Sequence, residues 1–137
     1  MGENILKIKS YSFAIRIVKL SQFLQNDRKE FVLSKQILRS GTAIGALIRE
    51  AEYGQSKIDF IHKMSIALKE TNETQYWICL LKHTGYIDEK LFDSIESDCT
   101  ELLKILIASI KTSKQWTIIH YSLLSINLTM SKYDEIK

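Results

Sequence analysis

Proline is absent from this sequence, and glycine occurs only five times in 137 residues. These two residues break or end helices more readily than others, so a chain that nearly lacks them favours long, uninterrupted helices. Apolar residues make up 45% of the chain and charged residues 26%, as is typical of a globular protein and not of a disordered one. The length fits one domain with a core of its own.

Cysteines and long apolar runs are equally scarce. The only cysteines, Cys79 and Cys99, fall on apolar faces of predicted helices, which indicates buried free thiols in a reducing compartment. The first twelve residues, MGENILKIKSYS, lack the apolar stretch of a signal peptide. No apolar run approaches the ~20 residues that a membrane span needs. We therefore expect a cytoplasmic protein that makes no contact with a membrane.

Charge is distributed unevenly along the chain. Residues 1–69 hold twelve Lys and Arg against six Asp and Glu, whereas residues 70–137 hold seven against ten. The basic half is compatible with nucleic-acid binding, with head-to-tail contacts between copies, or with neither. The net charge of +3 is low for a dedicated nucleic-acid-binding protein.

Hydrophobic periodicity predicts four helices. The first covers about residues 10–25, where apolar residues recur at spacings of three and four: Phe13, Ile17, Leu20 and Leu24. This stripe is widened by Ala14, Ile15 and Val18. We therefore expect the first helix to be packed on more than one side.

The second helix follows a polar loop, and Asp27 with Glu30 has the spacing of a capping box at its start. Its core stripe consists of Ile37, Gly41, Ile44, Ile48 and Ala51, and its opposite face carries Lys35, Arg39, Thr42, Ala46 and Arg49. Gly41 and Gly45 lie four residues apart, and a glycine inside a helix costs about 1 kcal/mol relative to alanine. Close approach of another helix is the usual compensation, so tight helix packing is expected at both glycines.

Gly54 is placed to end the second helix in a left-handed conformation. Ser56 with Asp59 has capping-box spacing for a third helix over about residues 57–83. The core seam of this helix consists of Phe60, Met64, Ala67, Thr71, Thr74, Ile78 and Leu81. The two threonines are expected to bond to backbone carbonyls one turn earlier.

The far side of the third helix carries Glu73 together with an apolar cluster of Tyr76, Trp77 and Leu80. An exposed patch of this kind usually marks an interface. These residues therefore predict a contact between copies of the chain. The alternative is that the first helix or the C-terminal segment covers the patch.

Gly85 is placed to end the third helix, and Asp88 to cap the fourth. The fourth helix is expected to end near Ser113, with a core stripe of Phe92, Ile95, Cys99, Leu102, Leu106 and Ile110. The segment that follows is rich in β-branched residues and lacks a clean period, so it is compatible with an extended tail, an extra helix, or order only in an oligomer. We predict an all-α, antiparallel up-down-up-down four-helix bundle over residues 1–115, followed by an irregular C-terminal tail over residues 116–137.

Sequence strings in the second and third helices resemble one bacterial family. They are QILRSGTAIGA at residues 36–46, Glu50-Ala51, Gly54-Gln55-Ser56, Asp59-Phe60, Lys63-Met64, IALKE at residues 66–70, Glu73 and Tyr76-Trp77. Over about residues 5–115 the sequence resembles the four-helix-bundle proteins encoded in intervening sequences of bacterial 23S rRNA genes. It departs at Leu47, where that family usually has asparagine, so any polar role of the asparagine is missing. Residues after Lys114 have no counterpart in the resemblance.

This resemblance implies a four-helix bundle and a homo-oligomer, with a pentamer as the expected assembly. It implies no established activity. A related group of bundle proteins accompanies the reverse transcriptases of diversity-generating retroelements, where a basic pentameric barrel engages nucleic acid. Nucleic-acid binding is therefore a hypothesis by analogy.

No residue pattern in the sequence predicts catalysis. Di-iron bundles need Glu-x-x-His pairs, and the nearest pattern here is a single Asp59-x-x-His62. The resemblance marks Glu50, Glu70 and Glu73 as recurrent, but ion pairs with nearby Arg and Lys explain them more simply than acid–base chemistry. The cysteines and glycines match no pattern of a nucleophile or a phosphate loop. We expect no enzymatic activity, cofactor, metal or small-molecule substrate.

Basic residues of the first two helices predict a nucleic-acid-binding surface, formed by Lys9, Arg16, Lys19, Lys35, Arg39 and Arg49. Repetition in a ring would multiply this charge, and phosphate binding grows with the number of neutralised charges. The leading hypothesis is a non-enzymatic homo-oligomer that binds nucleic acid, in particular RNA, through this surface. The alternative is a structural or adaptor module that docks a protein partner without nucleic acid.

Overall fold

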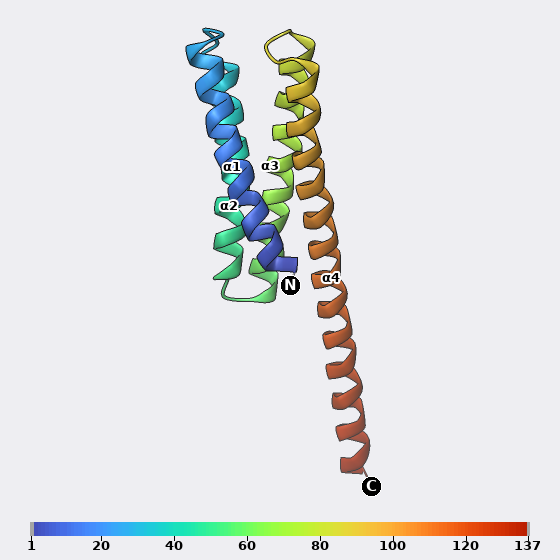
Figure 1. Ribbon diagram of the computed structural model, residues 1–137. Helices are drawn as coiled ribbons and strands as arrows, with labels where there is room; N and C mark the ends of the chain where they lie inside the picture. Colours follow the sequence, from blue (N-terminus) through green and yellow to red (C-terminus); the bar gives the residue numbers. More distant parts are fainter. Residues whose placement is uncertain (1, 137) are drawn as a thin grey trace.

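Four helices make up the computed structural model, which describes the backbone of residues 2–136 and the side chains of residues 5–127 and 131. They are α1 (Gly2–Asn26), α2 (Leu33–Glu52), α3 (Lys57–His83) and α4 (Glu89–Ile136). Consecutive helices run in opposite directions along the bundle (Figure 1). α1 and α3 each pack against both α2 and α4, so the four helices enclose one core. The prediction of an all-α four-helix bundle is confirmed.

The core consists of the predicted apolar stripes. Every predicted core residue of α1 and α2 is buried, and so is the α3 seam except for the half-buried Phe60. α1 begins at Gly2, eight residues before the predicted start. Ser10 and Leu6 lie one and two turns before Phe13 on the same side of the helix, and both are buried, so the buried stripe extends toward the N-terminus. The sequence also predicted that the side of α1 with Ile15 and Val18 would be packed. Within the described residues no helix covers that side, and both side chains are exposed.

The connection between α1 and α2 corrects the predicted capping box. Asp27 does not cap α2, which begins six residues later. Instead the buried carboxylate of Glu30 accepts hydrogen bonds from the backbone N–H groups of Val32 (3.0 Å) and Ser34 (2.8 Å). The first N–H groups of a helix have no partner within the helix, and this carboxylate supplies one from the preceding loop.

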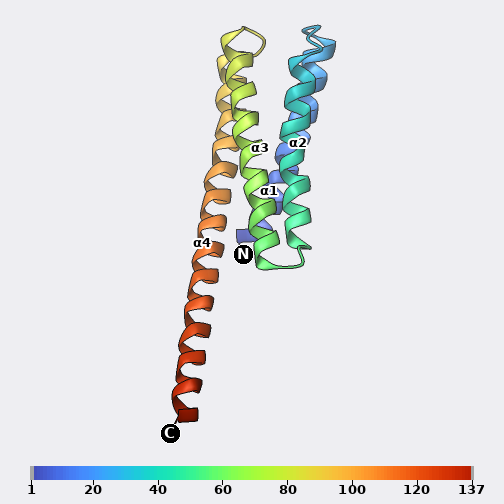
Figure 2. The same cartoon turned by 180° about the vertical axis from the view of Figure 1, so that it is seen from behind.

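The break between α2 and α3, visible from behind in Figure 2, corrects a second prediction. α2 ends at Glu52 with Tyr53 as its C-cap, and Gly54 does not adopt the left-handed conformation. Limited space favours glycine at position 54, because a Cβ there would lie 3.0 Å from Oδ2 of Asp59 and 3.1 Å from the carbonyl oxygen of Ala51, closer than most Cβ contacts. The predicted cap of α3 is confirmed, since the Ser56 hydroxyl accepts the N–H of Asp59 at 3.0 Å.

The turn between α3 and α4 forms as predicted. Gly85 has a φ of +80°, the left-handed region that glycine adopts without a steric penalty. The N–H of Tyr86 bonds to the carbonyl of Leu81 (2.9 Å) and that of Gly85 to Lys82 (3.1 Å), which is the Schellman pattern. Asp88 caps α4 by accepting the N–H of Leu91 at 2.8 Å.

α4 is much longer than predicted, and the expectation of an irregular tail is wrong. The helix continues without a break from Glu89 to Ile136 and passes the end of the other three helices (Figure 1). We call residues 116–136 the α4 extension. Since β-branched residues lower helix propensity only slightly, a preceding helix with a packed stripe can propagate through them. No helix in the described part of the chain is long and apolar enough to cross a membrane.

α1 and α2 approach each other closely at the two helical glycines. A Cβ added to Gly41 would lie 2.8 Å from both Cγ atoms of Ile17, which are buried and stiff because Ile is β-branched. A Cβ added to Gly45 would meet Ser10 at 3.4 Å or more, an ordinary contact distance.

These two glycines should therefore respond oppositely to alanine. Gly41→Ala should lower the free energy of unfolding by a net of about 1–2 kcal/mol, because overpacking costs more than the gain of about 1 kcal/mol in helix propensity. Gly45→Ala should leave it unchanged or raise it by up to about 1 kcal/mol. Urea denaturation followed by circular dichroism measures both, and a Gly41→Ala protein as stable as Gly45→Ala would contradict the proposed steric role.

Candidate functional site

A polar network joins α2 to α3 on the bundle surface. The Arg39 guanidinium donates to both carboxylate oxygens of Glu70 (3.2 and 3.3 Å) and also binds Glu73. The indole N–H of Trp77 donates to the same Glu73 carboxylate at 3.1 Å. The hydrogen bond that Arg39 donates to Glu70 raises the pKa of Arg39 above its usual value, and the bond to Glu73 raises it further. The structure thus brings together residues that the sequence predicted for two roles, nucleic-acid binding and subunit contact.

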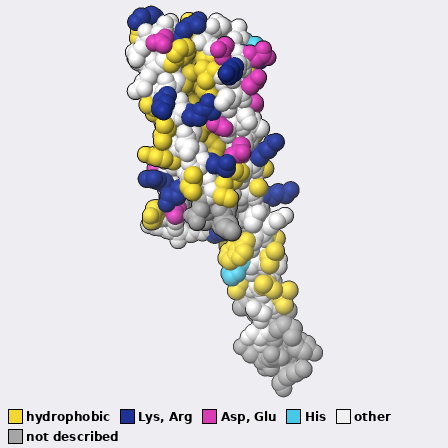
Figure 3. Space-filling view, viewed as in Figure 1, with side chains coloured by type: hydrophobic (Ala, Val, Ile, Leu, Met, Phe, Trp, Pro, Cys, Tyr) yellow, Lys and Arg dark blue, Asp and Glu magenta, His cyan; other side chains and the backbone are white. Residues whose placement is uncertain are grey.

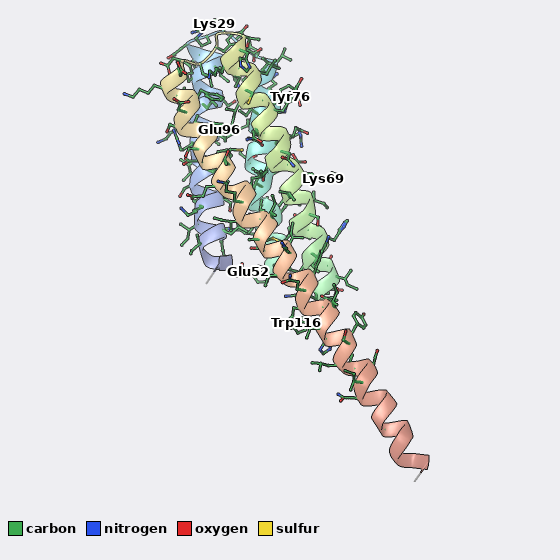
Figure 4. The ribbon with its side chains drawn as sticks, turned by 90° about the vertical axis from the view of Figure 1, so that its right-hand side faces the viewer. Lys29, Glu52, Lys69, Tyr76, Glu96 and Trp116 are labelled. Atoms are coloured by element: carbon green, nitrogen blue, oxygen red, sulfur yellow. The ribbon has the colours of Figure 1, made fainter. Side chains whose placement is uncertain are left out.

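The predicted interface group on α3 is only partly exposed. Tyr76 is 60% exposed (Figure 4), while Trp77 is half-buried and packs against the core. The two rings meet edge to face, with centroids 5.0 Å apart and planes inclined at 74°. Leu80 is half-buried one turn further along the helix. We call Tyr76, Trp77 and Leu80 the α3 outer face.

A larger apolar surface lies on α1, and the sequence prediction did not single it out. At about 100° per residue, the side of α1 opposite its buried stripe carries Ile8, Tyr11, Ile15 and Val18, which are exposed by 38% to 66%. We call these four residues the α1 outer stripe. Their spacing of three, four and three was visible in the sequence as a second periodic set, shifted from the core stripe.

A shallow groove of about 280 Å³ runs beside the α1 outer stripe, between α1 and α2. Its floor is made of small side chains, which leave room for another surface to approach: Ala14, Thr42, Gly45 and Ala46. The rim carries Tyr11 and Arg49, and the Arg49 guanidinium carbon lies 5.6 Å from the centroid of the Tyr11 ring.

The six predicted nucleic-acid-binding cations do not form one continuous surface. Three of them are engaged with acidic residues of other helices. Lys9 binds Glu101 at 2.5 Å and Arg16 binds Asp98 at 2.6 Å, both across to α4, while Arg39 binds α3. Figure 3 accordingly shows acidic side chains interspersed among the basic ones on this side of the bundle.

Lys19, Lys35 and Arg49 are different, because none of them forms an ion pair within the described residues. Lys19 and Lys35 are exposed, and Arg49 is held only by its contact with Tyr11. We call these three residues the unpaired cations.

The chemistry of the thiols and carboxylates is that of structural groups. Cys99 is buried, and desolvation, with a smaller contribution from the nearby Glu96, raises its pKa to about 12. Its thiol lies 3.6 Å from the carbonyl oxygen of Thr71. Glu70 and Glu73 are occupied as acceptors for Arg39.

Thr71 and Thr74 bond to the carbonyls of Ala67 and Glu70 one turn earlier, as predicted. The described residues contain no group of three or more His, Cys, Asp and Glu side chains that could hold a metal ion.

Comparison with known proteins identifies relatives of most of the chain. The family model described as 23S rRNA-intervening sequence protein matches residues 3–108. A solved structure from Bacteroides thetaiotaomicron VPI-5482, described as a protein with unknown function from the S23 ribosomal protein family, is 59% identical. The match covers 99% of that protein and 81% of this chain, with a TM-score of 0.80. Among curated proteins no match was found.

The raised pKa of Cys99 predicts protection from alkylation. At pH 8 a thiol with a pKa of about 12 is almost entirely protonated, and the thiolate is the reactive form. Iodoacetamide should therefore leave Cys99 unmodified in the folded protein while modifying it in urea, as measured by peptide mass spectrometry. Cys79, which is half-buried, serves as the internal comparison, and alkylation of Cys99 at the rate of Cys79 in the folded state would contradict the burial.

Proposed function

Because the chain belongs to the 23S rRNA-intervening sequence protein family, we propose that it is a non-enzymatic, self-associating helical bundle that acts through its surface. The observation that carries this proposal is the α1 outer stripe. Four large apolar side chains lie in a row on the side of α1 that faces away from the core. Exposed apolar stripes of this kind usually mark contact sites.

The partner of the α1 outer stripe is the α3 outer face of a second copy. α1 and α3 lie at opposite corners of the bundle, because each packs against α2 and α4. Two different complementary surfaces on opposite sides of one subunit join copies head to tail, and such contacts close into a ring when the rotation between copies allows it. A ring of five subunits is the assembly that the family resemblance implies.

Charges beside the two surfaces support this pairing. The α3 outer face adjoins the carboxylates of Glu70 and Glu73, whereas the α1 outer stripe adjoins Lys19. Full burial of an Ile, Val or Leu side chain contributes about 1.5–3 kcal/mol, so the four residues of the stripe supply most of the contact energy. The charges would then select the orientation.

The absence of catalysis is part of the proposal. It is supported by the occupation of Glu70 and Glu73 by Arg39 and by the protonated state of the Cys99 thiol near neutral pH. Action in the cytoplasm is also proposed, and the two free cysteines fit a reducing compartment.

Substitution of Ile15 by Glu tests the self-association. The charge would be buried without a partner at the centre of the contact, so the mass of the assembly in solution, measured by light scattering, should fall roughly twofold or more. Ile15 is exposed in the single chain, so the fold itself should remain intact by circular dichroism.

Gln22→Glu is the matched control, because Gln22 is an exposed residue on the same side of α1 beyond the apolar stripe. It should retain the mass of the unmodified protein. An unmodified protein that is monomeric, or an Ile15→Glu protein of unchanged mass, would refute self-association through the α1 outer stripe.

Nucleic acid, in particular RNA, is the ligand that we propose for the assembled surface. The supporting observation is that Lys35 and Arg49 have no acidic partner within the described residues. Two cations per copy are few, but a ring repeats them, and phosphate affinity grows with their number. The alternative is a structural or adaptor module that docks a protein partner without nucleic acid.

The salt dependence of RNA binding separates the two. We expect a short fluorescent single-stranded RNA to bind at low salt, with a log–log salt slope that falls by about 2 in the Lys35→Gln/Arg49→Gln protein. Lys9→Gln is the control and should change the slope less, because Lys9 is already paired with Glu101. Fluorescence anisotropy measures the slopes. The adaptor alternative would be favoured if the RNA failed to bind at low salt, or if Lys9→Gln lowered the salt slope as much as Lys35→Gln/Arg49→Gln.

A further inference from the structure

The α4 extension is the part of the molecule that the proposed function does not use. It begins eight residues after the end of the family match at residue 108. Its large apolar side chains up to residue 127, the part whose side chains the structure describes continuously, are 44% to 65% exposed, namely Trp116, Ile118, Ile119, Tyr121, Leu123, Leu124 and Ile126. Figure 3 shows these apolar side chains on the surface where α4 leaves the bundle, and Figure 4 marks Trp116 at that point.

A helix of this composition needs a covering partner in water. Residues 115–131 contain no Asp, Glu, Lys or Arg. Among the described residues, a charged group of another helix approaches only the start of this segment, where the Lys57 ammonium lies 5.3 Å from the centroid of the Trp116 ring. Isoleucine, tyrosine and tryptophan are not strong helix formers, and isolated helices of this length are marginal even with the best formers. A helix that is apolar on most sides is normally buried.

Four of the exposed side chains fall on one stripe. Trp116, Ile119, Leu123 and Ile126 are separated by three, four and three residues, which is the spacing of the seam between paired helices. Ile118 and Tyr121 lie on the other side of the helix, at about 100° per residue. His120 stacks on Trp116, with centroids 5.0 Å apart and planes inclined at 7°, so the first residue of the stripe is held in place.

We propose that the α4 extension pairs with the α4 extension of a second copy of this chain, through the stripe of Trp116, Ile119, Leu123 and Ile126. A copy is the fitting occupant because Ile119, Leu123 and Ile126 lie in a segment without charged side chains, so two such segments meet without electrostatic repulsion.

The available area fits a small contact between two copies. The four side chains of the stripe, each about half exposed, offer on the order of 400 Å² per copy, about half of the ~800 Å² per partner of a standard interface. The contact is separate from the head-to-tail contact between the α1 outer stripe and the α3 outer face. This proposal rests on the proposed self-association and adds a second contact between copies. Either contact can be disproved without disproving the other.

The test uses the full chain in buffer free of lipid and detergent. In the Ile15→Glu background, which removes the proposed α1 contact, the protein should still be a dimer by light scattering. Adding Leu123→Glu should convert it to a monomer. The double variant should also lose about one sixth of its helical circular dichroism signal, because the 116–136 segment loses its packing partner.

Tyr121→Glu in the same background is the matched control. It places the same charge on the other side of the extension and should leave the dimer and the helical signal intact. A monomer with Ile15→Glu alone, a dimer that persists in Ile15→Glu/Leu123→Glu, or equal dissociation by Tyr121→Glu would each overturn pairing through this stripe. If the Ile15→Glu protein keeps the assembly mass of the unmodified protein, only the α1 contact is disproved. The Leu123→Glu single variant then tests the extension by its helical signal, and an undiminished signal would overturn the pairing.

Discussion

The close contact between α1 and α2 determines how the rest of the molecule is arranged. Ile17 lies where a side chain on Gly41 would be, and the backbone of Ser10 lies beside Gly45. Two contacts along one helix fix both its separation from its neighbour and its rotation about its own axis. With that rotation set, Lys9 and Arg16 meet acidic residues of α4, and Ile8, Tyr11, Ile15 and Val18 are left facing solvent.

Ion pairs between helices reduce the positive charge that the basic half of the sequence presents on the surface. The excess of positive charge in residues 1–69 suggested one broad cationic surface. In the folded chain, Lys9, Arg16 and Arg39 lie against carboxylates contributed by the second half of the sequence. Exposed pairs of this kind add little stability, but they reduce the charge that remains for a phosphate group. The basic and acidic halves largely compensate each other within one subunit.

Local signals were reliable where the chemistry is contained in a few neighbouring residues. Ser56, Gly85 and Asp88 act where the sequence placed them, because a cap or a turn depends on the backbone within four or five residues. Asp27 and Gly54 were misjudged for opposite reasons. The capping carboxylate comes from Glu30, whose position depends on how the loop packs. Gly54 is favoured because Asp59 and Ala51 approach it, which a preference for left-handed backbone does not reveal.

The sequence alone was sufficient for the four helices, their buried stripes and the family, because periodicity and short strings are carried by neighbouring residues. It also contained the spacing of the α1 outer stripe, but periodicity cannot tell whether this second apolar side is covered by another helix. The tertiary structure decided that question, since the packing of α1 on α2 and α4 leaves this side exposed. It likewise decided that Trp77 packs inward while Tyr76 stays exposed. The course of residues 116–136 was decided in the same way, because a helix already stabilised by packing continues where the local sequence gives no clear period.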